Sequence, residues 1–391
     1  MTVQSPATGQ SAPSQQFAPR EQFTYDGRLG ELFGIFFTNL LFSIITLGFY
    51  RFWAKTRMRR YIWSRVSLNG DAFEYTGTGG ELLIGFLIVV GFFIVATVLK
   101  TVLDLAAPPD SPIPALATVL FALIIVYLVF VARYAAQRYR LTRTLWRGIR
   151  GGMTGSAWAW GFKAMLLGVL TAITLGFAGP WAQMRLLDDR VNNSYFGDAK
   201  ASMHSSSGPL YVAFLIGLAI NLIGSFVIIA LCGVIAGGSG FLSEFLTLAG
   251  QNTDTEEARR QMDELMKQHL GLLIGLGVFF YLSVIVLGIV AFAQYYVAML
   301  REIANKLTMA ELRFGTTVTI GRIIGLALVN ILVYLLTFGL GLPVVIHRSL
   351  RFITNNIQVY GEIEGSQITH ADLPRPRYGE GLLEAFDPGL F

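Results

Sequence analysis

Basic side chains gather just after three short sequences of the form Thr-x-Gly. Guanidinium and ammonium groups bind phosphate and carboxylate oxygens, so these side chains could hold lipid headgroups or an anionic substrate at the inner membrane surface. The competing interpretation is ordinary anchoring, because cytoplasmic loops of membrane proteins carry an excess of Lys and Arg. The three glycines predict backbone breaks where a side chain would obstruct the turn. The glycines are Gly48, Gly176 and Gly339, and the candidate cations are Arg51, Lys55, Arg57, Arg59, Arg60, Arg185 and Arg348.

A second set of candidate residues is polar, uncharged and placed inside apolar runs. Its members are Asn39, Asn221, Gln294 and Asn330. Ion-coupled transporters usually carry acidic or basic side chains at this depth, so the set argues against proton coupling and leaves a passive or lipid-handling path open. Hydrogen bonding between helices is the simpler interpretation of the same residues.

The sequence contains no motif that predicts catalysis. It lacks a nucleophile elbow, a P-loop, a dinucleotide fingerprint and the spacing of a metal-binding motif. The single cysteine, Cys232, allows no disulfide within the chain, and the four histidines are scattered. We therefore expect no enzymatic activity, no metal site and no cofactor.

The composition indicates that the candidate cations and polar residues lie on or next to membrane-embedded helices. Of 391 residues, 53% are hydrophobic and 14% are charged, whereas soluble domains carry about 25% charged residues. The net charge of +5 favours cytoplasmic loops that face anionic lipid over nucleic-acid binding. The sequence therefore predicts an integral membrane protein whose partners include membrane lipids and no nucleic acid.

Seven apolar runs set the limits of this architecture. Three of them end near the Thr-x-Gly sequences and are short for a crossing, which needs about 20 residues, so they either cross fully or are re-entrant or interfacial. The fold class is therefore all-α and polytopic, with four to seven membrane-embedded helices and short cytoplasmic β-hairpins such as one at Asn69-Gly70. The long runs are about 82–103, 115–132, 209–236 and 270–297, and the shorter runs are about 32–49, 164–181 and 323–346.

Charge placement slightly favours four crossings over seven. Seven crossings put the basic segment 301–322 outside. Four crossings leave outside only 104–114, which has no Lys or Arg, and 237–268, in which six acidic residues outnumber three basic ones. The scheme with four crossings thus obeys the positive-inside rule better.

The three Thr-x-Gly sequences belong to longer segments of similar pattern. Subtracting 128 from the second and 291 from the third aligns the three glycines, and it aligns Arg57 with Arg185 and Arg348. The pattern predicts a threefold internal repeat, which in membrane proteins often frames a site at the repeat interface. Duplication kept only for folding is an equally good interpretation. The repeat units are about 23–80, 145–205 and 308–370.

These units and the four long runs make up one polytopic domain at about 23–370. Residues 1–22 are rich in Ser, Pro, Gln, Ala and Thr and predict a disordered tail, and 371–391 predict a flexible tail. The sequence Thr78-Gly-Gly-Glu81 predicts a helix that begins with a capping box. Four pairs with GxxxG spacing predict close helix packing, namely Gly30/Gly34, Gly233/Gly237, Gly271/Gly275 and Gly321/Gly325.

Three stretches of the first unit resemble the YjgN-like family of bacterial inner-membrane proteins. They are Glu31-Leu-Phe-Gly, Thr46-Leu-Gly-Phe-Tyr-Arg-Phe-Trp-Ala-Lys-Thr-Arg and Gly70-Asp-Ala-Phe-Glu-Tyr-Thr-Gly. The resemblance covers about Phe23 to His370 and is closest in the first unit. It implies a multi-pass protein of the bacterial inner membrane. The biochemical role of the family is unassigned, so the resemblance supplies no catalytic or ligand-binding residues.

The function that these features favour is that of a non-enzymatic transport or lipid-interacting unit. Substrate, protein partner and homo-oligomeric state stay open at this point. The alternative is a membrane scaffold or subunit that docks a cytoplasmic partner through its basic stretches and small hairpins.

Overall fold

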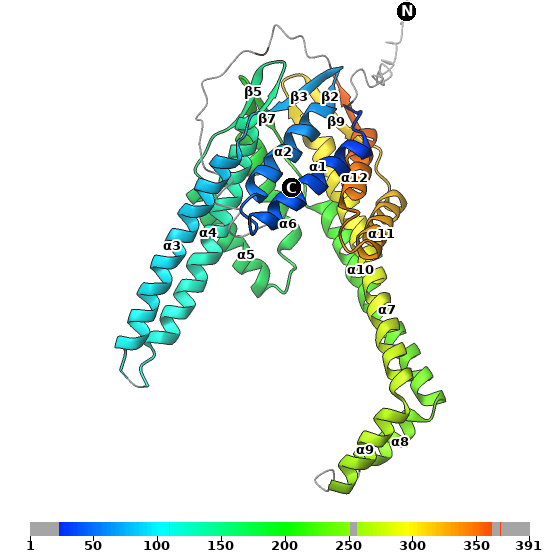
Figure 1. Cartoon of the computed structure of the whole chain (residues 1–391). Helices are drawn as coiled ribbons and strands as arrows, with labels where there is room; N and C mark the ends of the chain where they lie inside the picture. Colours follow the sequence, from blue (N-terminus) through cyan, green and yellow to red (C-terminus); the bar gives the residue numbers. More distant parts are fainter. Residues whose placement is uncertain (1–22, 109, 251–255, 362–367, 369–391) are drawn as a thin grey trace, which may run out of the picture.

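A ten-stranded antiparallel sheet and five helical connections build the molecule (Figure 1). The computed structural model describes residues 23–108, 110–250, 256–361 and 368, so the predicted tails at 1–22 and 371–391 lie outside the described residues. Each strand pairs with its neighbours in sequence. The strands are β1 (Phe23–Tyr25), β2 (Val66–Leu68), β3 (Asp71–Tyr75), β4 (Thr144–Trp146), β5 (Ile149–Met153), β6 (Ser194–Phe196), β7 (Ala199–Ser202), β8 (Thr308–Met309), β9 (Leu312–Thr316) and β10 (Ile357–Tyr360).

The connections between strands alternate between tight turns and helices. Tight turns join β2 to β3, β4 to β5, β6 to β7 and β8 to β9. The predicted turn at Asn69-Gly70 is confirmed, and its φ angles of +57° and +84° are those of a type I′ turn. Because neighbouring strands are antiparallel, the tight turns all lie at one end of the strands and the helical connections all leave from the other end.

Two helical connections are long enough to cross a bilayer. One pairs α3 (Gly79–Ala106) with α4 (Ile113–Arg143), and the other pairs α7 (Gly208–Gly238) with α10 (Leu270–Lys306). Each of these helices contains one of the four long apolar runs. The two pairs diverge below the sheet, and α8 (Phe241–Ala249) and α9 (Glu256–Gln268) lie at the far end of the second pair (Figure 1). The predicted capping box is confirmed at the start of α3.

The other three helical connections are short hairpins of two helices each. Their first helices have 17 residues, which makes them about 26 Å long, shorter than the roughly 30 Å of a hydrocarbon core. The first helices are α1 (Leu29–Ile45), α5 (Ala157–Ile173) and α11 (Ile320–Leu336). The second helices are α2 (Arg51–Arg65), α6 (Gly179–Asn192) and α12 (Leu342–Asn356).

The lengths, charges and tip contacts of the short hairpins favour a re-entrant or interfacial position over a full crossing. If α1 crossed, α2 would have to cross back to reach β2, yet α2 carries six Lys or Arg among 15 residues, and each is costly to place in a hydrocarbon core. At the tip of the first hairpin, the Arg51 guanidinium lies 4.8 Å from the ring centre of Phe86, near the start of α3. At the tip of the second, Phe177 contacts Phe214, near the start of α7, with ring centres 5.7 Å apart. These observations agree with the arrangement of four crossings, which stays a prediction.

The first and third short hairpins close the molecule into a ring. β1 and β10 lie close together without being hydrogen-bonded neighbours. Across this seam, Tyr25 of β1 contacts His347 of α12, with ring centres 5.4 Å apart. A buried cluster joins α12 to the first hairpin below the same seam, and it contains Leu32, Met58, Ile62 and Ile346.

The prediction of an all-α fold with separate short β-hairpins is too narrow. The strands have only two to five residues each, and a lone two-stranded hairpin of this size is marginally stable in water. They are stabilised by joining in one sheet. The sequence did not predict this pairing because paired strands can be far apart in the chain. β4, for example, pairs with β3 but follows it only after the whole helical connection α3–α4.

The GxxxG pairs make no close helix contact with the described part of this chain, which corrects a second prediction. A Cβ built on any of these eight glycines meets no described atom within 4 Å beyond its own helix backbone and chain neighbours. Close helix contacts occur at other glycines. A Cβ on Gly217 of α7 would lie 2.7 Å from the carbonyl oxygen of Ala291 on α10, and a Cβ on Gly161 of α5 would lie 2.6 Å from the Val131 side chain on α4.

Candidate functional site

The three Thr-x-Gly sequences form turns of the same geometry. Gly48, Gly176 and Gly339 have φ angles of +89°, +93° and +84°, a region that favours glycine. Each glycine N–H donates to the carbonyl five residues earlier, at 2.7, 2.7 and 2.9 Å, as in a Schellman helix ending. Each threonine hydroxyl donates to the carbonyl four residues earlier and accepts from the N–H four residues later. Threonine and glycine thus build the turn together.

The tip of each turn is an exposed apolar residue at positive φ. Leu47, Leu175 and Phe338 are 91%, 88% and 95% exposed, with φ angles of +51°, +51° and +49°. A residue other than glycine is strained there by roughly 1–2 kcal/mol. Large apolar side chains that protrude at strained positions are suited to contact with acyl chains.

A pocket of about 560 Å³ lies between the first and third short hairpins. We call it the hairpin pocket, and its polar lining comprises Asn39, Ser43, Arg51, Lys55 and Tyr334. The rest of its wall is apolar apart from Gly339, and it comes from α1, α2, α11, the third turn and the start of α12. Its volume lies within the range of small-molecule sites, roughly 300–1,000 Å³.

Asn39 supplies a buried hydrogen-bond acceptor to this pocket. The side chain is 7% exposed, and its Nδ2 donates to the carbonyl of Ala54 at 3.2 Å, which ties α1 to α2. Its Oδ1 is buried and accepts no hydrogen bond from the described residues. A buried acceptor without a donor costs about 1–3 kcal/mol, so a ligand with an N–H or O–H group would satisfy it.

Two of the predicted cations line the same pocket. The Arg51 guanidinium carbon lies 4.9 and 4.8 Å from the ring centres of Phe52 and Phe86, which fixes the direction of the side chain. Lys55, one turn later, is 5% exposed. Among the described lining residues there is no carboxylate, so the pocket combines apolar walls with positive charge.

Three other predicted cations on α2 point elsewhere. Arg59 donates to the Tyr75 hydroxyl at 3.3 Å, and Arg60 donates to the carbonyl of Gly77 at 2.8 Å. Both contacts hold α2 against β3 and the start of α3. Arg57 is exposed.

The equivalently spaced arginines of the other hairpins also lie outside the hairpin pocket. Arg185 is exposed on α6, and Arg348 is half-buried on α12, where its Nε donates to Oδ1 of Asn330 at 3.3 Å. Of Arg57, Arg185 and Arg348, only Arg348 lines a described pocket, and that pocket is a different one. The structure therefore does not bring these three together in either described site.

The remaining predicted polar residues take part in helix contacts. Asn221 donates to the carbonyl of Gly217 in its own helix at 3.0 Å, and Gln294 of α10 lies opposite Gly217. Asn330 donates to the Ser349 hydroxyl at 3.3 Å, which joins α11 to α12. Of the four predicted polar residues, Asn39 alone lines the hairpin pocket.

Sequence reasoning missed the wall that the third hairpin contributes. Ser43 and Tyr334 both line the pocket, yet nearly 300 residues separate them. The offset of 291 aligns these two positions, and this was the available signal. In the described part of the chain, no group of three or more His, Cys, Asp or Glu side chains could hold a metal ion.

Comparisons with known proteins identify relatives of the whole chain. A family model described as "Bacterial protein of unknown function (DUF898)" matches residues 20–385. Inner membrane protein YjgN of Salmonella typhimurium is 25% identical over 385 residues, which cover 90% of this chain and 91% of the relative. The protein of that name from Escherichia coli strain K12 is 30% identical over 158 residues, which cover 40% of this chain and 37% of the relative. No solved structure matches.

These relatives are named as inner membrane proteins, and four helices among the described residues are long and apolar enough to cross a bilayer. The chain is therefore a multi-pass protein of the bacterial inner membrane. The family match spans nearly its whole length. The chain belongs to the bacterial family of unknown function DUF898.

Proposed function

We propose that the protein is a non-enzymatic transport or lipid-interacting unit that binds an anionic lipid in the hairpin pocket. The observation that carries the proposal is the lining of this pocket, which combines apolar walls with Arg51, Lys55 and the unsatisfied Oδ1 of Asn39. Acyl chains suit the walls, and a phosphate suits the two cations. A headgroup hydroxyl or amine would donate to Asn39.

The proposal includes a cytoplasmic location for the sheet. Basic residues are frequent where helices meet the sheet, as in α2 and in the last turns of α4. The far connection of the first long pair, at 104–114, has no Lys or Arg. The positive-inside rule then favours a cytoplasmic sheet, and the bound lipid would come from the inner leaflet.

The proposal also treats the three short hairpins as copies of one repeat. Adding 128 to the bounds of α1 gives those of α5, and adding 291 gives those of α11. The three turns share their φ angles and hydrogen bonds. The hairpin pocket lies between the first and third copies, where a repeat interface predicts a site.

Native mass spectrometry of the detergent-purified protein tests the lipid site. We expect the wild type to retain phosphatidylglycerol in preference to phosphatidylcholine. Arg51→Gln should weaken this binding about tenfold or more, because a hydrogen bond to a charged group contributes about 1.5–3 kcal/mol. Arg57→Gln is the matched control, because Arg57 is exposed on the same helix outside the pocket. Equal losses in both variants would assign the effect to surface charge and refute the site.

Reconstituted liposomes test the transport part of the proposal. Lipid movement is followed with a fluorescent anionic lipid whose outer-leaflet fraction is bleached by dithionite. Vesicles that contain the protein should bleach further than empty vesicles. If a broad panel of lipids and solutes shows neither lipid movement nor flux above empty controls, the protein is not a transport unit.

A membrane scaffold is the second candidate, and the ten-stranded sheet favours it. All four tight turns lie at the ends of the strands that face away from the helices, where a soluble partner could bind. A pull-down in mild detergent should then recover a stoichiometric protein partner or a second copy. Recovery of none would count strongly against the scaffold.

A further inference from the structure

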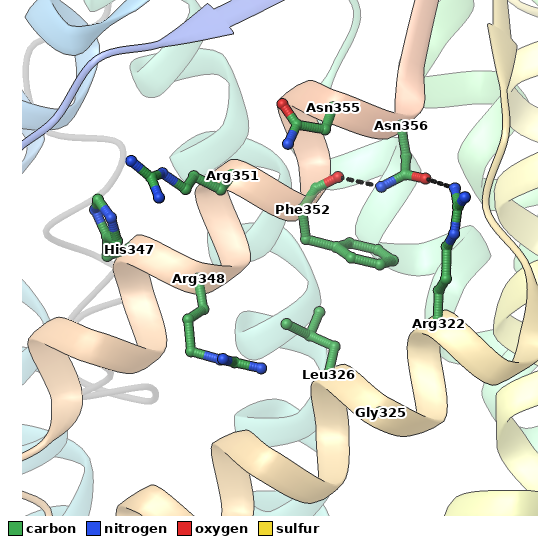
Figure 2. A pocket seen from close by; sticks show the side chains of 9 residues that line it. All are labelled: Arg322, Gly325, Leu326, His347, Arg348, Arg351, Phe352, Asn355 and Asn356. Carbon is green, nitrogen blue, oxygen red and sulfur yellow. Dashed lines mark hydrogen bonds between the residues drawn. The ribbon is translucent and has the colours of Figure 1, made fainter.

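We infer a second binding site, specific for a phosphate group, in the groove between α11 and α12. The groove has a volume of about 560 Å³ and lies toward the sheet end of the third short hairpin (Figure 2). We call it the arginine groove. Its main lining residues are Arg322, Leu326, His347, Arg348, Arg351 and Phe352. It shares no lining residue with the hairpin pocket, so the inference goes beyond the proposed lipid site and does not rest on it.

Three guanidinium groups line this groove. In Figure 2 the Phe352 ring lies between Arg348 and Arg322, and Arg351 lies beside His347. The Nη1 of Arg322 donates to Oδ1 of Asn356 at 2.9 Å, so the side chain is held in place. Arg322 Nη1 also donates to the carbonyl of Thr317 at 3.5 Å, and Arg348 Nε donates to Asn330. Each guanidinium has five N–H donors, so both side chains keep donors for a ligand. No carboxylate is present among the lining residues that the structure describes.

The first short hairpin has an acid where the third has a cation. The offset of 291 that relates α1 to α11 aligns Glu31 with Arg322. Glu31 forms an ion pair with Arg65, with Oε2 and Nη2 3.0 Å apart. In the third hairpin, Arg322 and Asn356 stand at the positions of Glu31 and Arg65. A neutral ion pair in the first hairpin is therefore a net positive charge in the third.

The second short hairpin neutralises its charge in another way. Asp189 stands at the position of Phe352, and it forms an ion pair with Lys163, which stands at the position of Leu326. The third hairpin has apolar side chains at both positions. It thus keeps its cations and adds an apolar surface next to them.

Gly325 keeps this groove open. A Cβ on Gly325 would meet no described atom within 4 Å. The second hairpin has Phe162 at the equivalent position. A large side chain at 325 should therefore fill the groove without displacing the backbone.

A phosphate group fits this combination of residues. Arginine binds phosphate oxygens through charge-assisted, often bidentate hydrogen bonds, while Phe352 and Leu326 can contact the apolar part of the same ligand. Burial and the nearby Arg351 lower the pKa of His347, so this ring is neutral at pH 7 and the arginines supply the charge. The sheet end of the hairpin can be reached by a lipid headgroup and by a soluble phosphorylated compound.

Binding to the full chain in phosphatidylcholine nanodiscs tests the groove. One probe is phosphatidic acid placed in the nanodisc, and the other is glycerol 3-phosphate in solution. Gly325→Phe fills the groove and keeps every charge, so it should weaken binding of the phosphate probe at least tenfold. The matched control is Gly34→Phe, at the equivalent position of α1, where a Cβ also meets no described atom. It should bind as the wild type does.

The outcomes separate the sources of the phosphate and the two proposed sites. Binding of phosphatidic acid alone assigns a lipid headgroup, and binding of glycerol 3-phosphate assigns a soluble ligand. Binding of neither probe, or an unchanged affinity in Gly325→Phe, overturns the groove as a site. Because the hairpin pocket would also bind phosphatidic acid, the lipid probe is measured with Arg51→Gln already in place. Glycerol 3-phosphate should bind Arg51→Gln as it binds the wild type, and an equal loss of glycerol 3-phosphate binding in Arg51→Gln and Gly325→Phe would also overturn a separate site. Arg348→Gln supplies a second variant if Gly325→Phe does not fold.

Discussion

Replacing the three tip residues with asparagine should weaken insertion of the short hairpins into the bilayer without weakening the fold in detergent. Leu47, Leu175 and Phe338 are 88–95% exposed, so their side chains contribute little packing within the chain. Each is held near φ +50°, where the strain of an L residue is roughly 1–2 kcal/mol. Asparagine populates this region more readily than leucine or phenylalanine. The triple variant should therefore unfold in detergent at the same temperature as the wild type or at a slightly higher one.

The substitutions lose transfer free energy only where the tips lie in the membrane. Transfer of one Leu or Phe side chain from water into an apolar environment contributes about 1.5–3 kcal/mol. Three tips together give roughly 5–9 kcal/mol, and asparagine supplies none of it. This is enough to change the depth at which the hairpins lie, while the four long helices keep the protein in the bilayer.

Electron paramagnetic resonance measures the depth of the tips. A nitroxide at Phe49→Cys, in a Cys232→Ala background, reports on the first tip in liposomes. Oxygen should reach the label in the otherwise unchanged protein, and a water-soluble nickel chelate should not. The tip substitutions should raise nickel access. If nickel reaches the label before the tips are changed, the hairpins lie in water and the reasoning is wrong.

Other parts of the fold carry three further predictions. A membrane-impermeant maleimide added to intact cells should label Asp110→Cys and leave Ala310→Cys unlabelled, because four crossings put these turns on opposite sides; labelling at 310 would refute this topology. Glu81→Gln should destabilise the protein by about 3 kcal/mol in thermal unfolding, because it breaks a largely buried ion pair with Arg143; a loss below about 1 kcal/mol would contradict this role. Burial lowers the pKa of His347, so the unfolded state binds the proton first and stability should fall as pH drops below about 6.5 and stay level above it. His347→Gln should flatten this part of the curve of melting temperature against pH, and identical curves would exclude the effect.

Features with a local cause could be predicted from the sequence. The four long helices follow from uninterrupted apolar runs. The turn at Asn69-Gly70 and the capping box at Thr78 depend on residues within four positions of one another. The three turns at Gly48, Gly176 and Gly339 depend on one threonine and one glycine each. In all these cases the partner atoms come from a short stretch of chain, so the pattern of residue types is sufficient.

Features that depend on distant partners could not be predicted in the same way. Strands of two to five residues carry too few side chains to specify a pairing, so the joining of β3 to β4 across a whole helical connection left no local sign. The GxxxG spacing predicted close helix packing at those glycines, but the close contact between α7 and α10 is at Gly217. Spacing alone does not show which face of a helix contacts a neighbour. Asn39 was identified as a candidate by its depth, but its unsatisfied oxygen depends on the third hairpin and on the course of α2.

The third short hairpin takes part in both proposed sites, and its geometry argues that they hold separate phosphates. Leu342 at the start of α12 lines the hairpin pocket, whereas Arg351 lines the arginine groove. Arg348, which also lines the groove, lies six positions after Leu342 and Arg351 lies nine positions after it, so about 9 to 13 Å of helix axis separates the two linings. A single phosphate cannot span that distance. The hairpin pocket lies toward the exposed apolar tip and suits a lipid with buried acyl chains, while the groove lies toward the sheet and suits a more hydrated phosphate. A ligand in one site should therefore leave the charges of the other available for binding.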